Sequence, residues 1–299
     1  MQARAPGKLV LSGAYSVLEG APALVAAVDR YVVADATRDA TFVTDELKEA
    51  IRLRVMTRPV WFDAAALREN TPNGESRKLG LGSSAAILVA SLAAAWPRLS
   101  DEAELGSRLF PEALAIHRAA QRGGSGIDVA ASCFGGILAC RIATVGLEVV
   151  GVTMPRVAFE AWACRQSAST SEMLAQIRMF AVTEPAAYRK LIGDARGGAE
   201  AAVAATEPSA FIEAIVAQRT ALAELGARSG TGIMTAEVDA LHACASAERA
   251  AFYPAGAGGG DVALFLGLAA SSEGFRARAE ALGLMRIELG LGARGVHRS

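Results

Sequence analysis

The sequence has few residues of the kinds that build metal cages and disulfide frameworks. Its 299 residues include only four cysteines and three histidines, and no two cysteines form a C-x-x-C pair. The histidines are scattered, whereas a metal cage needs several ligands at close spacing. We therefore interpret the cysteines as buried, reduced thiols of a cytoplasmic protein. They are Cys133, Cys140, Cys164 and Cys244.

An excess of charge and a long apolar run are also missing. The 30 basic and 31 acidic residues leave a net charge of −1, so bulk electrostatics favour neither nucleic acid nor an anionic membrane as a partner. No apolar run reaches the ~18 residues of a membrane span. The opening residues, MQARAPGKLV, lack the apolar segment of a signal peptide. An acidic ligand would need a local cluster of cations.

What the chain does have is ample material for a core, since 52% of its residues are hydrophobic. Strand and helix patterns are mixed in both halves, which predicts an α+β fold of two domains or one large one. Strands are expected at 8–13, 23–36, 51–62, 135–142, 147–154, 157–164, 262–268 and 285–289. Helices are expected at 83–96, at 101–121 with a break at Pro111, and at 171–226, 235–251 and 272–282.

Glycines and hydroxyls stand at the start of an apolar helix pattern in KLGLGSSAAILVASLAAAW, residues 78–96. Gly80, Gly82 and Ala85 fit a dinucleotide-binding fingerprint, but the preceding residues are polar where that motif needs an apolar strand. A Walker A loop is absent. Two interpretations remain, a phosphate-binding helix N-terminus and a serine N-cap after a glycine turn.

Three further stretches carry glycine or charge at turns. Lys8 follows Pro6 and Gly7 at the expected start of a strand in PGKLVLSGAYSVLEG. Asp128 opens a helix in GGSGIDVAAS. Four glycines precede Asp261 in AGAGGGD. Taken singly, each stretch is also compatible with an ordinary turn, helix cap or hairpin loop.

Together and in this order, PGKLVLSGAYSVLEG, LGLGSSAA and AGAGGGD resemble the three motifs of the GHMP kinases, from Pro6 to Leu266. The resemblance implies an N-terminal ribosomal-S5-like ATP-binding domain and a C-terminal ferredoxin-like α/β domain. We place them at residues 1–155 and 156–299, divided next to Pro155. It also implies an ATP-dependent kinase of a small molecule, with ATP and Mg²⁺ at the site.

Within the family, HRAAQRGGSGIDVAAS and RQSASTSEML resemble segments of phosphomevalonate kinases, which phosphorylate 5-phosphomevalonate, a phosphorylated organic acid. There are departures. Arg122 stands where those enzymes commonly have lysine, and the lysine before their last motif is missing. The alternatives left open are mevalonate kinase or another GHMP small-acid kinase, and a non-catalytic metabolite sensor. Lys8, Ser84 and Asp128 are all present, which favours an enzyme, as monomer or homodimer.

The resemblance also implies roles for individual residues. Lys8 and Asp128 would form the reacting centre, and Ser84 or Ser83 would bind Mg²⁺. The ATP phosphates would lie on Gly80, Leu81, Gly82, Ser83, Ser84 and Ala85. The substrate would contact Lys8, Arg122, Ser125, Gly126, Ser167, Ser169, Thr170, Gly258 and Gly259.

Each of these residues also has a plain structural interpretation. Asp128 could cap a helix, Lys8 could be a strand-edge charge, and the serines near 169 could cap the next helix. Lys78 and Arg165, like Arg122, could be counter-charges or surface cations. His117 reads as a packed helical residue. Trp61 and Phe62 read as core or as the wall of a nucleotide pocket.

Overall fold

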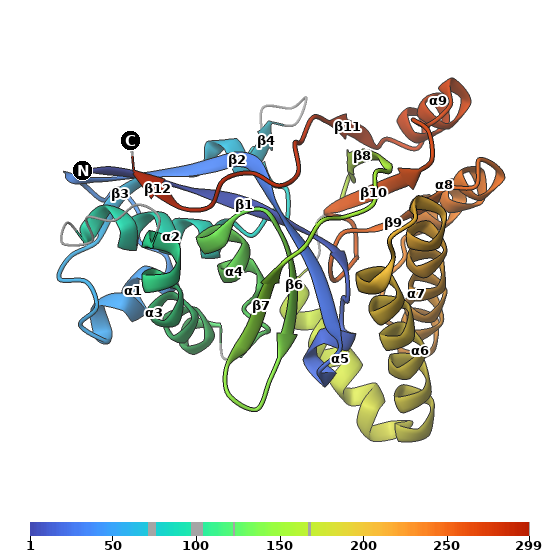
Figure 1. Ribbon diagram of the computed structural model, residues 1–299, viewed down its shortest axis with the longest axis horizontal. Coiled ribbons are helices and arrows are strands. Elements are labelled where there is room, and N and C mark those ends of the chain that lie inside the picture. Colours follow the sequence, from blue (N-terminus) through green and yellow to red (C-terminus); the bar gives the residue numbers. More distant parts are fainter. Residues whose placement is uncertain (71–75, 97–103, 122, 167–168, 299) are drawn as a thin grey trace.

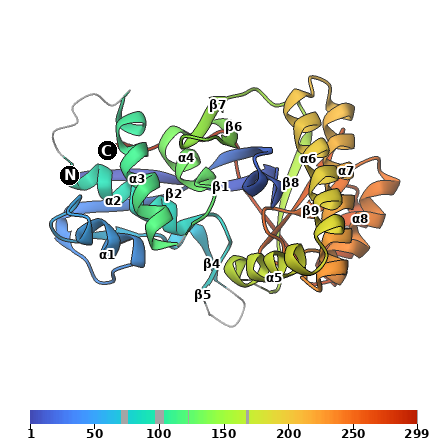
Figure 2. The same ribbon diagram turned by 90° about the horizontal axis from the view of Figure 1, so that it is seen from below.

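The structure, a computed structural model, describes residues 1–70, 76–96, 104–121, 123–166 and 169–298. Its described strands form a larger sheet, a smaller sheet and a short hairpin (Figure 1). Helices α1 to α4 gather at one end of the molecule and α6 to α9 at the other (Figures 1 and 2). The expected α+β class is confirmed, and the larger sheet spans the middle.

The larger sheet is antiparallel, in the order β12–β1–β2–β6–β7, with β3 beside β2. Its register shifts between Pro6 and Gly7 and between Val10 and Ser12. Its strands are β1 (Gln2–Ser12), β2 (Pro22–Asp39), β3 (Val60–Asp63), β6 (Ile137–Ile142), β7 (Leu147–Gly151) and β12 (His297–Arg298).

The smaller sheet, also antiparallel, runs in the order β11–β8–β10–β9. Its strands are β8 (Ala158–Ala163), β9 (Ala251–Pro254), β10 (Val262–Gly267) and β11 (Met285–Ile287), and the hairpin is β4 (Arg68–Asn70) with β5 (Ser76–Lys78). Trp162, Phe252 and Phe265 pack around Phe275 in one cluster. This aromatic cluster fixes α8 and α9 on the sheet.

The described helices are α1 (Asp45–Arg52), α2 (Ser83–Ala95), α3 (Leu105–Ala120), α4 (Ile127–Phe134), α5 (Thr170–Thr183), α6 (Pro185–Ala204), α7 (Pro208–Ser229), α8 (Ala236–Ala247) and α9 (Glu273–Ala281), with 3₁₀ turns η1 (Ser16–Glu19) and η2 (Ala65–Leu67). Thr44, Thr235 and Ser272 cap α1, α8 and α9 through their side-chain oxygens. These are the helix starts that Ser and Thr favour.

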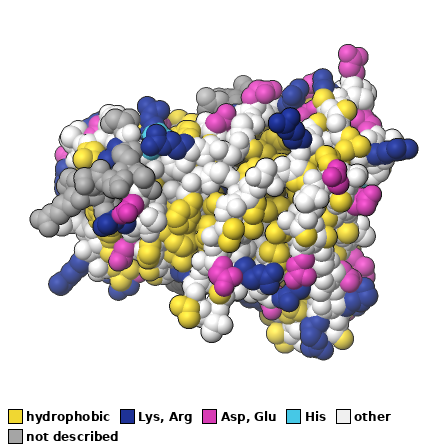
Figure 3. Space-filling model, in the orientation of Figure 1, with side chains coloured by type: hydrophobic (Ala, Val, Ile, Leu, Met, Phe, Trp, Pro, Cys, Tyr) yellow, Lys and Arg dark blue, Asp and Glu magenta, His cyan; other side chains and the backbone are white. Residues whose placement is uncertain are grey.

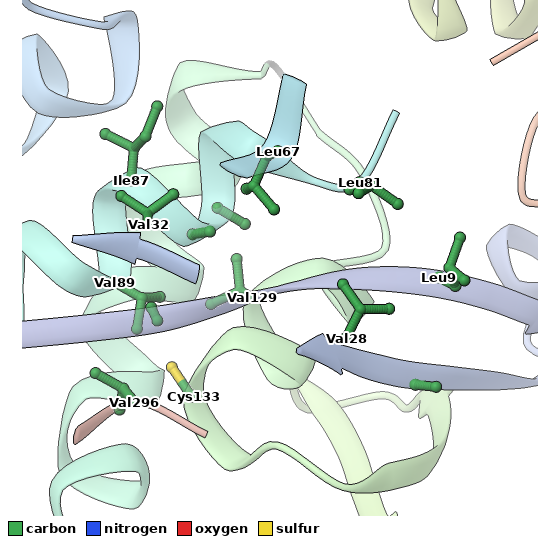
Figure 4. Packing of buried hydrophobic residues seen from close by; sticks show 14 of the residues in the cluster. Leu9, Val28, Val32, Leu67, Leu81, Ile87, Val89, Val129, Cys133 and Val296 are labelled. Carbon is green, nitrogen blue, oxygen red and sulfur yellow. The ribbon is translucent and has the colours of Figure 1, made fainter. Parts of the chain in front are cut away.

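Helix α2 is apolar on every side, and ten of its thirteen residues are buried. A helix of this kind must lie inside a core, and α2 packs on β1, β2, α3 and α4. Figure 4 shows Ile87 and Val89 of α2 in one cluster with Val28, Val32 and Val129. The expected helix at 83–96 is confirmed, and its burial holds its first turn rigidly in place.

The strand expected at 51–62 is wrong in its first part. Residues 45–52 are helix α1, and the strand starts only at Val60. Leu47 and Ala50 are buried at helical spacing, and Thr44 caps the helix. The apolar alternation therefore came from a helix end and the turn after it, not from a pleated strand.

Three other local predictions are also wrong. Pro111 does not break α3, because its exposed position lets solvent reach the carbonyl that loses its partner. Pro6 lies inside β1, at the bulge, and not at a strand start. The helix expected to reach 251 ends at Ala247, and a turn with Arg249 at φ 55° leads into β9.

The end of the chain returns to the larger sheet. His297 pairs with Arg4, Leu291 bridges to Val28 and Arg294 to Gly135. A cut at 155 would therefore separate β12 from β1. The division into residues 1–155 and 156–299 stays a prediction.

Candidate active site

Four distant segments meet at the first turn of α2. Lys8 from β1 donates a hydrogen bond from Nζ to Gly80 O at 3.0 Å. A Cβ on Gly80 would lie 2.6 Å from Asp261 Oδ2, and one on Gly82 would lie 2.8 Å from Lys8 Cγ. Asp128 and Asp261 both act electrostatically on the Lys8 ammonium. The structure thus brings together the three glycine-containing motifs and Asp128.

The turn before α2 is shaped by its glycines. Gly80 has φ 67° and Gly82 has φ 73°, in the left-handed region that glycine occupies at little cost. Gly82 is the N-cap residue, and no side chain caps the helix. The first N–H groups of a helix have no partner within it and carry partial positive charge. Because no serine cap forms, the alternative of a plain capping turn loses its support.

The Lys8 side chain lies between this turn and two carboxylates. Burial lowers the pKa of its ammonium, although Asp128 and Asp261 raise that pKa in opposition. Its own backbone is anchored, since Lys8 N donates to Leu81 O at 2.8 Å. Both the side-chain ammonium and the backbone N–H of Lys8 therefore bond the turn before α2. Lys8 is not a strand-edge charge facing solvent.

Asp128 lies in the first turn of α4, whose N-cap is Gly126 at φ 81°. That φ favours glycine, and a Cβ on Gly126 would also lie 2.2 Å from Leu114 Cδ1 and displace that side chain. Asp128 Oδ1 accepts from the N–H of the next residue, Val129, at 3.0 Å, and no side chain caps α4. Ser125 lies in the same turn, and its carbonyl accepts from Arg118.

His117 of α3 was interpreted as a packed residue, and its side chain is indeed only 7% exposed. Its Nε2, however, lies 3.4 Å from Asp128 Oδ2 and 3.4 Å from Ser84 Oγ. Sequence reasoning missed this contact. The available signal was the spacing of His117 eleven residues before Asp128, on the helix that precedes the α4 turn.

The last glycine-rich loop, residues 256–260, packs on the segment before α8. Gly258 has φ 86°, and a Cβ there would lie 2.2 Å from Ile233 O. Gly259 N donates to the same carbonyl at 3.1 Å. A Cβ on Gly260 would lie 3.0 Å from Gln166 O. The loop therefore reaches the segment that leads into α5, and it delivers Asp261 to Gly80.

For the other predicted substrate contacts the structure shows either a different local role or no described position. Ser169 caps α5, accepting from Glu172 N at 3.4 Å, and its hydroxyl lies 2.9 Å from that of Ser171. Thr170 is the first residue of α5. Arg122 and Ser167 lie outside the described residues. For Ser169 the structure supports the capping role and tests no other.

Two of the candidate counter-charges, Arg165 and Lys78, lie among the described residues. Arg165 packs against Gly283, where an added Cβ would lie 1.9 Å from Arg165 Nε. Lys78 is exposed on β5. Its neighbour Arg77, which the sequence analysis did not single out, pairs with Glu69 at 3.7 Å and acts electrostatically on Cys164. Arg77 therefore carries positive charge from the hairpin toward the smaller sheet.

Trp61 and Phe62 lie on β3, which pairs with residues 33–39 of β2, whereas Lys8 pairs with Ala27 of the same strand. The guanidinium of Arg38 stacks over the Trp61 ring, 3.6 Å from its centroid, and Phe42 packs edge-on against Phe62. Phe62 also packs against the main core. These contacts support the interpretation of Phe62 as core and give Trp61 a partner on the protein.

The oxygen donors around the α2 turn fit Mg²⁺ in chemistry. Among the described residues no group of three or more His, Cys, Asp or Glu side chains could hold a metal by itself. Mg²⁺ commonly binds through one or two protein oxygens, substrate phosphates and water. The Ser84 hydroxyl and the nearby Asp128 carboxylate are donors of that kind. A protein-only metal cage is thus not the expected arrangement.

Three of the cysteines, Cys133, Cys140 and Cys164, are buried as expected, whereas Cys244 is only partly buried. All four are free, and burial raises the pKa of Cys140 and of Cys164 to about 12. In the described part of the chain no helix is long and apolar enough to cross a bilayer. The face in Figure 3 mixes acidic and basic side chains around a largely apolar and neutral middle.

The fold is that of the GHMP kinases. Residues 48–136 match the family model described as "GHMP kinases N terminal domain". A phosphomevalonate kinase of Streptomyces sp. (strain CL190) is 26% identical over 337 residues, covering 88% of each chain.

Solved structures share the fold across the whole chain. A Lin0012 protein from Listeria innocua has a TM-score of 0.81 at 21% identity, covering 100% of this chain and 99% of that one. The Streptococcus pneumoniae phosphomevalonate kinase in complex with phosphomevalonate and AMPPNP has a TM-score of 0.76 at 20% identity, covering 97% and 99%. At such identities the likeness establishes the fold.

Proposed function

We propose that the protein is an ATP-dependent kinase that phosphorylates 5-phosphomevalonate to 5-diphosphomevalonate. The observation that carries the proposal is Lys8, bonded to Gly80 O at 3.0 Å beside an uncapped helix N-terminus and two carboxylates. The choice of acceptor is supported by the 26% identical phosphomevalonate kinase, which covers 88% of the chain. A cytoplasmic enzyme, monomeric or dimeric, fits its free thiols.

The turn from Gly80 to Ala85 would bind the nucleotide phosphates. Its left-handed glycines allow close approach of the backbone, and the first N–H groups of α2 are donors without a side-chain cap. A helix N-terminus of this kind favours an anion through its dipole and its free N–H groups. The buried body of α2 keeps these donors in place, so they need little reorganisation when charge develops.

Lys8 and Asp128 would act on the transferring phosphoryl group. In the reaction an acceptor phosphate oxygen forms a bond to the γ-phosphorus, the bond to the β–γ bridging oxygen breaks, and the electron pair leaves with ADP. An ammonium has three donors, so Lys8 can keep its bond to Gly80 and still donate to a phosphoryl oxygen. Asp128 would orient Lys8 and balance its charge.

Asp128 need not remove a proton from this acceptor. The second pKa of a phosphate monoester is about 6, so the nucleophile is already ionised at neutral pH. Ser84, with Ser83 as the alternative, would bind Mg²⁺. When bound, that ion neutralises charge on the nucleotide phosphates. Positioning and charge balance are then the main tasks of the protein residues.

Acceptor contacts are proposed at the turn before α4 and at the glycine-rich loop. The first would use Ser125 and Gly126, and the second Gly258 and Gly259, together with residues 167–170 and Arg122. The loop at 256–260 comes close to Gln166, since a Cβ on Gly260 would lie 3.0 Å from Gln166 O, which supports contact of one molecule with this loop and with the segment before α5.

The test is a coupled assay of ADP release with mevalonate, 5-phosphomevalonate, 5-diphosphomevalonate, homoserine and galactose. We expect turnover with 5-phosphomevalonate to exceed that with every other acceptor. Faster turnover of unphosphorylated mevalonate would make the protein a mevalonate kinase. Nucleotide binding without turnover on any acceptor would support a sensor and contradict the proposal.

A further inference from the structure

The contacts of His117 join the nucleotide side of the site to the Asp128 side. Ser84 belongs to α2, His117 to α3 and Asp128 to α4. A single atom, His117 Nε2, lies 3.4 Å from an oxygen of each of the other two residues. No other described side chain is recorded in contact with both.

The chemistry of the three groups determines which nitrogen carries the hydrogen. An ionised carboxylate can only accept hydrogen bonds, so the nitrogen facing Asp128 must be the N–H of the ring. The other nitrogen, Nδ1, is buried and has no hydrogen-bond partner. A buried nitrogen lone pair without a partner costs less than a buried N–H without one. Both facts favour hydrogen on Nε2.

In this tautomer the protonated Nε2 lies 3.4 Å from both Asp128 Oδ2 and Ser84 Oγ, and its N–H can be shared between them. Both contacts are long for hydrogen bonds, and such bonds often tighten only in the loaded enzyme. Since Ser84 Oγ accepts from the ring, its own hydrogen can point elsewhere and a lone pair can face a metal or a phosphate. The ring therefore fixes both the separation of the two oxygens and the rotamer of the serine.

We propose that His117 is a positioning residue of the kinase, sharing its Nε2–H between Ser84 and Asp128. The inference rests on the proposed function, because it assigns the two ends to nucleotide and phosphoryl transfer. It gives His117 no direct contact with substrate. Loss of this link lets Asp128 and Ser84 move independently, and a displacement of about 1 Å at such a site can cost ~10²-fold in rate.

Three variants of His117 separate positioning from packing. His117→Leu fills the space without a donor. His117→Gln places an amide nitrogen near the Nε2 position, and His117→Asn places it near the Nδ1 position instead. We expect kcat to fall about 10- to 10²-fold in His117→Leu and His117→Asn, and His117→Gln to recover most of it. The KM for MgATP should change less than kcat.

The control is His242, another histidine on a helix, whose Nδ1 accepts from Phe252 N at 3.3 Å in the smaller sheet. His242→Leu should leave kcat unchanged. A double variant of His117→Leu with Asp128→Asn should lose less than the product of the two single losses, because the histidine acts in part through the carboxylate. Equal losses in the Leu, Asn and Gln variants would mean that only packing matters and would overturn the proposal.

A second measurement does not depend on turnover. Two-bond ¹⁵N–¹H correlation spectra of the labelled protein distinguish the two neutral tautomers of each histidine. We expect hydrogen on Nε2 of His117. Hydrogen on Nδ1 would contradict the shared bond even in an active kinase. If the wild-type protein turned over no acceptor, the proposed function would fail, while this spectrum would still decide the geometry around His117.

Discussion

Tyr15 Oη donates a hydrogen bond to Ala257 O at 2.6 Å and joins two loops 242 positions apart in the sequence. Tyr15 follows β1 with a φ of 60°, rare for a bulky residue. Its ring is buried among Ile177 and Phe180 of α5 and other apolar side chains. The packing of this ring maintains the strained turn, and the turn directs the hydroxyl to the glycine-rich loop.

Replacement of Tyr15 by phenylalanine should therefore destabilise the protein. The change removes one buried hydrogen bond and leaves the ring, so the free energy of unfolding should fall by about 1 kcal/mol. Chemical denaturation measures it. Tyr188→Phe is the matched control, since that hydroxyl bonds Glu19 at the surface and its loss should cost under ~0.5 kcal/mol. Equal effects of both changes would argue against a structural link at Tyr15.

Gly82→Ala should weaken nucleotide binding. The added Cβ would lie 2.8 Å from Lys8 Cγ and displace that side chain. Gly136→Ala is the control, because Gly136 has nearly the same φ, 69°, and no atom within 4 Å of the added Cβ. Calorimetry with MgATP should show affinity lower by at least ~10-fold, or ~1.4 kcal/mol, for Gly82→Ala only. Wild-type affinity in folded Gly82→Ala would contradict the phosphate site.

Asp128→Asn tests whether the acceptor needs a base. With 5-phosphomevalonate we expect kcat to fall roughly 10- to 10²-fold, less than the ~10²–10⁴-fold that a lost general base can cost. Lys8→Ala should lower kcat as much or more, because it removes the cation facing the phosphoryl group. The double variant should be non-additive. A loss far above ~10³-fold for Asp128→Asn with a mild Lys8→Ala would indicate a hydroxyl acceptor.

The depressed pKa of Lys8 predicts an early alkaline limb in activity. Burial moves this pKa below its ordinary value of 10.5, so the free enzyme loses the cation at lower pH than an exposed lysine would. The quantity to follow is kcat/KM for MgATP, which reports groups of the free enzyme. Lys8→Arg should shift the limb upward, since a guanidinium stays charged. An unmoved limb would assign it to another group.

The lowered pKa of Lys8 also makes stability depend on pH, in the direction opposite to activity. Between the folded and unfolded pKa values of Lys8 the unfolded chain binds more protons, so this lysine's contribution to the free energy of unfolding rises with pH. Below the pKa of Lys8 in the folded protein, this lysine is protonated in both the folded and the unfolded chain, and the free-energy cost of burying its charge is fully present. In this window activity should therefore fall while the Lys8 contribution to stability increases, as pH titration of Lys8→Met against wild type would measure.

The parts of the fold and of the candidate site that could be predicted from the sequence are those determined by residues adjacent in the chain. The helix from Ser83 and its glycine turn follow from residues adjacent in sequence, and both were found. The link from His117 to Ser84 and Asp128 depends on how α2, α3 and α4 pack, which no periodicity encodes. Helix α1 was misread because Ile51, Leu53 and Val55 alternate by accident across a helix end, where a cap and burial of the preceding turn decide the structure.

The proximity of Asp261 to Gly80 is another contact that could not be predicted from the sequence, because it depends on tertiary packing. Asp261 was noticed only as the end of a glycine run, since its neighbour lies on a segment 181 positions earlier. Ser169 was left open between a substrate contact and a helix cap; the structure shows the cap, and the substrate contact stays a prediction. A serine before a helix has the same sequence signature in both roles.

The pairing of β12 with β1 has a consequence for how the molecule is made. Strand β1 of the larger sheet has an unpaired edge until residues 297–298 have been synthesised. At about 5–20 residues per second, translation of the chain up to that point takes roughly 15–60 s. An open strand edge is a template for pairing with other chains. In the nascent chain the edge of β1 is therefore open to pairing with other chains until residues 297–298 have been made and have paired with it.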